Sequence, residues 1–161
     1  GVGAQQPSAQ PAKPKPAPRV VATTQKRSLV RAAISVLLQQ PSLGLALEPP
    51  YGFKDLKQPG VELLVELLSL VHARPEITTG ALLQHFAERD ELNALQKLAS
   101  HALPGNDAIW RMELLDAVVQ LEKQTVEQRI EELQAKSRDG GLDEADKYEL
   151  RALLQARLGR S

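Results

Sequence analysis

Residues 107–137 read DAIWRMELLDAVVQLEKQTVEQRIEELQAKS, and their apolar positions recur at the three- and four-residue spacing of one long helix. The first half is dense in apolar side chains, as in a helix buried on several sides. The second half is mostly charged. The apolar residues of the first half are Ile109, Trp110, Met112, Leu114, Leu115, Val118, Val119 and Leu121, and those of the second are Val126, Ile130 and Leu133. The segment predicts a helix that begins in a core and leaves it.

The length of this helix predicts that it projects from the molecule. At 1.5 Å per residue it spans roughly 46 Å, whereas a domain of about 100 residues has a radius of gyration near 13 Å. The few apolar residues in its second half need a second helix to pack against. Residues 142–158, which follow directly after Gly140 and Gly141, are the expected second helix. We therefore expect a projecting helical hairpin that contacts another protein.

The preceding residues predict a small helical bundle. Apolar residues at helical spacing indicate a first helix at about Gln25 to Gln40. A second helix between Pro59 and Pro75 is apolar around most of its circumference, as expected of a central helix. Residues 42–58 between them predict a connection with a short turn near Phe53 to Leu56.

Polar residues at the starts of the later helices predict N-caps. Thr78 and Asp90 precede a third and a fourth helix, Asp107 begins the long helix, and Asp143, followed by Asp146, begins the last one. No window alternates with the period of a strand. The predicted fold is all-α: a small helical bundle, a long helix and a C-terminal helical hairpin.

Composition divides the chain into three parts. Residues 1–23 are rich in Pro and Ala and predict a disordered linker, which implies further domains before it. An SH3-type ligand within residues 13–18 is a minor alternative. Residues 24–121 predict the bundle, and residues 122–161 predict the hairpin.

Overall composition favours a cytoplasmic interaction module without cofactors. Lys and Arg number 20, as do Asp and Glu, so no basic field favours nucleic acid. The chain has no cysteine, which fits a reducing compartment. No apolar run approaches the length of a membrane span.

No residue pattern predicts catalysis or a metal site. His72, His85 and His101 lie on separate segments without a metal-ligand spacing, and Gly140-Gly141 lacks the lysine of a phosphate loop. The acidic runs of the hairpin are better read as solvated faces.

One local charge cluster remains. Lys26, Arg27 and Arg31 lie in the first turns of the first helix, where cations oppose the helix dipole. Beside them Val30 and Ile34 form an apolar strip, which suits an acidic peptide with a hydrophobic end. A solvated helix N-terminus is an equally good interpretation from the residues alone.

Three motifs and the charged hairpin together resemble a known family. The motifs are VRAAISVLLQQP at 30–41, ITTGALLQHF at 77–86 and LQKL at 95–98. The chain from Gln25 to Leu158 resembles the C-terminal helicase-binding domain of bacterial DnaG-type primase. The parent enzyme would be a DNA-directed RNA polymerase, and this part of it would be non-catalytic.

The resemblance implies two protein partners. The hairpin would bind the N-terminal domains of the hexameric replicative helicase through Val126, Ile130, Leu133, Tyr148, Leu150, Leu153, Leu154 and Leu158. The bundle would bind the acidic C-terminal tail of single-stranded DNA-binding protein through Lys26, Val30, Arg31, Ile34 and Lys97. Leu29 departs from the family, in which a relative has a hydroxyl side chain. We expect a monomer and neither a membrane nor a direct nucleic-acid partner.

Two other classes of function fit the sequence less well. A nucleic-acid-binding helical domain would use the basic first helix on phosphates, but zero net charge and the Glu-rich hairpin disfavour it. A free-standing enzyme would need a catalytic constellation, for which the sequence shows no candidate.

Overall fold

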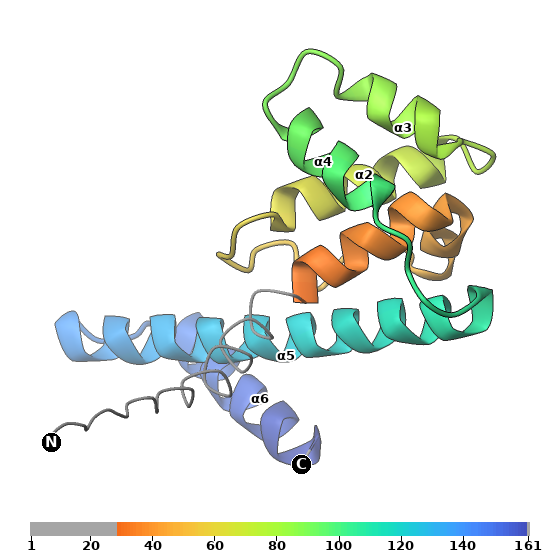
Figure 1. The fold of residues 1–161 in the computed structure, drawn as a ribbon. Helices are drawn as coiled ribbons and strands as arrows, with labels where there is room; N and C mark the ends of the chain where they lie inside the picture. The colour runs from red at the N-terminus through yellow and green to blue at the C-terminus, as the bar shows by residue number, and fades with distance from the viewer. Residues whose placement is uncertain (1–28, 161) are drawn as a thin grey trace, which may run out of the picture.

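The computed structural model describes residues 29–160, which form helices joined by short loops (Figure 1). The N-terminal helix is described over residues 29–39. It is followed by the 3-10 helix η2 (Pro41–Ala46) and by α2 (Val61–Ala73), α3 (Thr79–His85), α4 (Glu91–Ser100), α5 (Asp107–Asp139) and α6 (Glu144–Arg160). The predicted linker and the predicted first turn of the first helix lie outside the described residues. None of the helices described is long and apolar enough to cross a membrane.

Helix α2 is the centre of the bundle, as its apolar circumference predicted. Leu64, Leu67, Leu68 and Val71 are completely buried. The N-terminal helix, α3, α4 and the first part of α5 surround it and contribute to one continuous core. Buried aliphatic side chains of this kind are the main source of stability in a helical bundle.

The connection before α2 is more ordered than predicted. Pro41 begins η2, where Gly44 packs so closely that a Cβ atom would lie 2.9 Å from Leu37 Cδ2. The turn predicted near Phe53 is confirmed, since Lys54 N donates to Tyr51 O and Leu56 N donates to Phe53 O. Phe53 is fully buried and anchors this loop to the core.

Two of the four predicted N-caps are confirmed. The Thr78 hydroxyl accepts a hydrogen bond from Ala81 N, and Asp143 Oδ1 accepts one from Asp146 N at 2.8 Å. Asp90 makes no cap hydrogen bond through its side chain. The cap of α5 is Asn106 instead of Asp107, because Asn106 Oδ1 accepts from Ile109 N.

The long helix predicted from residue 107 is confirmed as the continuous helix α5. It crosses one side of the bundle and extends beyond it (Figure 1). The expectation that its first half is buried on several sides is wrong. Only the face with Leu114 and Leu121 is buried in the core, while Ile109, Met112 and Val119 are 47, 64 and 44 % exposed. A helix lying across a bundle has a neighbour on one side only.

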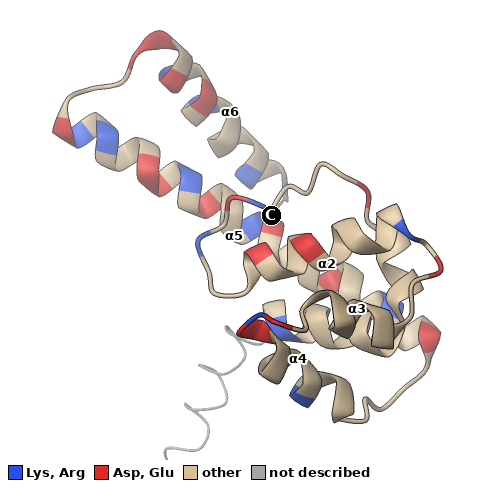
Figure 2. Cartoon of the chain, turned by 90° about the horizontal axis from the view of Figure 1, so that it is seen from above, with Lys and Arg blue, Asp and Glu red and all other residues tan. Residues whose placement is uncertain are grey.

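The end of α5 and α6 form an antiparallel hairpin that stands apart from the bundle (Figure 2). Gly140 and Gly141 make the turn, and their backbone N–H groups both donate to Lys136 O. Gly141 has a φ of +90°, a left-handed conformation that favours glycine. The hairpin has buried residues of its own, Ile130 and Leu133.

Candidate functional site

Some of the residues predicted to contact the helicase lie in the seam, the interface between the two helices of the hairpin. Ile130 and Leu133 of α5 are 2 and 1 % exposed, and Val126 is partly buried. From α6, Leu150, Leu153 and Leu154 are also partly buried. Burial places Ile130 and Leu133 in the seam between the two helices, and their contact with a partner protein stays a prediction.

The outer surface of α6 carries the remaining predicted residues. Tyr148 and Leu158 are each 74 % exposed, the highest values among the large apolar side chains described. Leu154 lies one turn before Leu158 but is partly buried, so it belongs to the seam. Tyr148 and Leu158 offer apolar area to a partner without any rearrangement of the hairpin.

Ion pairs fix the register of the hairpin. The Arg129 guanidinium donates to both oxygens of Glu149, at 2.8 and 2.9 Å, and Lys136 Nζ pairs with Asp146 Oδ2 at 2.5 Å. The hydrogen bond from Arg129 holds the pKa of Glu149 below its ordinary value, and Lys136 does the same for the pKa of Asp146. Figure 2 shows basic and acidic residues interspersed along both helices of the hairpin.

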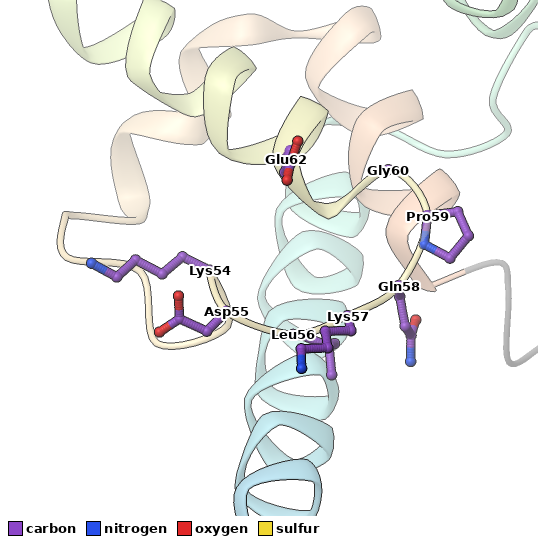
Figure 3. Close-up of a pocket in the computed structure, with 8 residues that line it drawn as sticks. All are labelled: Lys54, Asp55, Leu56, Lys57, Gln58, Pro59, Gly60 and Glu62. Atoms are coloured by element: carbon purple, nitrogen blue, oxygen red, sulfur yellow. The ribbon is translucent and has the colours of Figure 1, made fainter. Parts of the chain in front are cut away.

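The loop before α2 docks on α5 where the helix leaves the bundle. Gln128 Oε1 accepts from Lys57 N at 2.7 Å, and Gln128 Nε2 donates to Asp55 O at 2.9 Å. Gln58 Nε2 donates to Gln124 Oε1. Figure 3 shows this loop crossing α5. A hollow of about 590 Å³ is lined by residues 54–60 and Glu62. The contacts hold the hairpin helix against the bundle, and no signal in the sequence predicted them.

An apolar cleft of about 430 Å³ lies between the N-terminal helix, α2 and α4. Three of the predicted peptide-binding residues, Val30, Arg31 and Ile34, line it. The other lining residues are Gln58, Pro59, Gly60, Leu63, Ala94, Leu95 and Leu98. Lys97 is exposed on the same helix as Leu95 and Leu98 but does not line the cleft, and Lys26 lies outside the described residues.

The titratable side chains of the bundle make structural contacts. His72 Nε2 contacts Leu47 O, and His85 Nε2 lies 3.2 Å from Glu66 Oε2. Arg89 donates to the same Glu66 oxygen at 2.6 Å, which lowers the pKa of Glu66. Within residues 29–160, no three His, Asp or Glu side chains are grouped so that they could hold a metal ion.

The hairpin and the cleft occur in a chain similar to known primase domains. The family described as "DNA primase DnaG DnaB-binding" matches residues 30–153. The chain is 31 % identical over 130 residues to DNA primase of Escherichia coli K12, with 81 % of this chain and 22 % of the relative covered. It is also 31 % identical over 129 residues to DNA primase of Pasteurella multocida, with 80 and 22 % covered.

A solved structure extends this similarity to the fold. The DnaG primase C-terminal domain from Vibrio cholerae superimposes with a TM-score of 0.67 at 33 % identity, covering 78 % of this chain and 96 % of that one. This chain spans about a fifth of the length of its curated relatives.

Proposed function

This chain belongs to the DnaB-binding family of DNA primase DnaG, and we propose that its hairpin binds the N-terminal domains of the hexameric replicative helicase. The observation that carries the proposal is the pair of exposed apolar side chains on α6, Tyr148 and Leu158, on a hairpin that projects from the bundle. Aromatic and leucine side chains exposed in this way are suited to the apolar centre of a protein interface.

The proposed role of this contact is recruitment in the cytoplasm. A primase tethered to the helicase has a high effective concentration at the single strand that the helicase has just unwound. A contact of two exposed apolar side chains and a charged rim would be weak and reversible, so priming could begin and end without dissociating the helicase. The domain needs neither a cofactor nor a catalytic group for this role.

Substitutions on the outside of α6 test the helicase proposal. We expect Tyr148→Asp and Leu158→Asp to abolish co-elution with the helicase, because each puts a charge into the apolar contact. Met112→Asp is the matched control, since Met112 is also well exposed, at 64 %, but lies in the part of α5 that packs on the bundle. Helicase binding that survives both α6 changes in folded protein would remove the hairpin surface from the mechanism.

For the apolar cleft we propose the acidic C-terminal tail of single-stranded DNA-binding protein as the ligand. The cleft is large enough for one hydrophobic side chain and its neighbours, and Arg31 supplies a cation among its lining residues. Lys97, and Lys26 before the described residues, would add positive charge around it. Screening by salt should therefore weaken the interaction.

A charge reversal with a control tests the peptide proposal. We expect Arg31→Glu to weaken binding of an acidic peptide with a hydrophobic end, whereas Arg74→Glu, at the opposite end of α2, should leave it unchanged. Affinity that is indifferent to Arg31→Glu and to salt would contradict this use of the cleft.

Ion pairs of three arginines within residues 29–160 count against the nucleic-acid alternative. Arg89, Arg129 and Arg157 each donate to a glutamate of this chain. Guanidinium groups engaged in this way are poorly available to phosphates. A shifted band of single-stranded DNA at physiological salt would be the result that revives this alternative.

A further inference from the structure

The loop that forms one wall of the cleft is also the loop that docks on α5. Gln58, Pro59 and Gly60 line the cleft beside Val30 and Ile34. Gln58 simultaneously donates through its side chain to Gln124 of α5. One residue thus contacts both the candidate peptide site and the helix that carries the hairpin.

Residues next to Gln58 strengthen the attachment to α5. Gln128 binds the backbone of the loop on both sides of Leu56, at Asp55 O and Lys57 N. Lys57 Nζ lies 3.4 Å from Glu132. Gln124, Gln128 and Glu132 are spaced by four residues, so they present one continuous face of α5 to the loop.

The cleft wall depends on where this loop is held. Gly60 has a φ of +91°, and a Cβ atom there would lie 2.9 Å from Val30 Cγ1, so the backbone closely approaches the N-terminal helix. Pro59 fixes the backbone immediately before it. A loop released from α5 would lose the contacts that place Gln58 at this wall.

We infer that the cleft and the docking of α5 are coupled through residues 55–60, so that an acidic peptide in the cleft and the docked hairpin helix stabilise each other. The inference rests on the proposed peptide function. The favourable sign is part of the inference: Gln58 lines the cleft in the same conformation in which Gln58 and Lys57 are hydrogen-bonded to α5. A ligand stabilises the conformation to which it binds more tightly, and the coupling must act equally in both directions.

Two measurements on the whole chain test this coupling. The probe is a fluorescein-labelled peptide of aspartates that ends in phenylalanine with a free carboxylate. Gln124 and Gln128 act as positioning residues, so the double variant Gln124→Ala, Gln128→Ala should bind the probe about fivefold more weakly or worse, although neither residue lines the cleft. The exposed Gln120→Ala on the same helix is the matched control and should bind normally.

The reciprocal measurement follows hydrogen exchange of the Lys57 amide by NMR in the unmodified chain. Saturation with the peptide should slow this exchange, because the amide donates to Gln128. An unchanged Lys57 rate at saturation, or full affinity in a folded double variant, would overturn the coupling alone. Failure of the peptide to saturate the unmodified chain would overturn the peptide proposal and the coupling with it. The exchange measurement decides the question even where the double variant does not fold.

Discussion

The guanidinium of Arg129 on α5 donates two hydrogen bonds to the carboxylate of Glu149 on α6, at 2.8 and 2.9 Å. This bidentate geometry fixes the distance and the register of the two hairpin helices at once. Both residues also line a hollow whose other wall includes Asp55 and Lys57 of the loop before α2.

Loss of the Arg129 pair should loosen the hairpin locally. Both side chains are about two-fifths exposed, so solvent screening limits the contribution to about 1 kcal/mol or less. We expect Arg129→Ala to speed hydrogen exchange in α6 while exchange in α2 stays constant. The exposed Arg151→Ala should change neither. Faster exchange throughout the bundle would show that this pair acts on the whole fold instead.

Truncation of core residues should distinguish the stability of the hairpin from that of the bundle. Leu133 and Leu64 are both buried, but in separate clusters. Leucine-to-alanine changes at such sites cost about 2–5 kcal/mol. We expect Leu133→Ala to lower the melting temperature of the hairpin alone, and Leu64→Ala that of the bundle, as followed by methyl NMR signals from each part. If each variant lowered the melting temperatures of the hairpin and the bundle equally, the two parts would unfold as one unit. The predicted division at residue 121 would then not separate two independently stable parts.

Acid should destabilise the hairpin through its carboxylates. The ordinary pKa values of Asp146 and Glu149 are 3.8 and 4.5, and hydrogen bonds from Lys136 and Arg129 lower both in the folded protein. A carboxylate of lowered pKa stabilises the fold above its unfolded pKa, and this contribution is lost as the pH falls through the folded pKa.

Asp146→Asn isolates this effect. The variant should melt at a lower temperature than the unmodified chain near neutral pH, and it should lose less stability between about pH 5 and pH 3. Thermal melts followed by circular dichroism at a series of pH values measure both quantities. An identical pH dependence of the two proteins would contradict the role of the Lys136–Asp146 pair.

Tyr51 should tolerate loss of its hydroxyl. Its side chain is 8 % exposed, and its hydroxyl has no hydrogen-bond partner within the described part of the chain. Burying an unsatisfied polar group costs about 1–3 kcal/mol. We therefore expect Tyr51→Phe to equal or exceed the stability of the unmodified chain in urea unfolding. A loss of more than about 1 kcal/mol would indicate that the hydroxyl is satisfied in solution.

Periodicity predicted the elements of this fold because their apolar residues have regular spacing. The central position of α2 and the extent of α5 follow from such spacing, whereas the turn of the hairpin was predicted from Gly140 and Gly141. Spacing alone did not decide whether α5 stays continuous near residues 120–124. The exposure of Ile109, Met112 and Val119 could not be predicted. The sequence shows that these side chains are apolar, but it does not show whether another helix covers them.

The sequence predicted which residues belong to the candidate sites, but not how those residues are arranged. Helical spacing brought Val30, Arg31 and Ile34 to one side of the first helix, and they do line one cleft. The sequence did not show which apolar residues of the hairpin pack between its two helices and which are exposed. Contact with a second helix and contact with a partner protein both require apolar residues three or four positions apart. The Gln124 and Gln128 contacts join residues more than 65 positions apart through amide side chains, for which no local pattern exists.

The most direct test of the helicase proposal is hydrogen exchange of this chain alone and saturated with the hexameric helicase of the same organism, read by mass spectrometry. We expect saturable binding with protection concentrated in α6 and the distal part of α5, and little change in α2 to α4. Protection confined to the bundle, or no binding by a folded sample, would contradict the account.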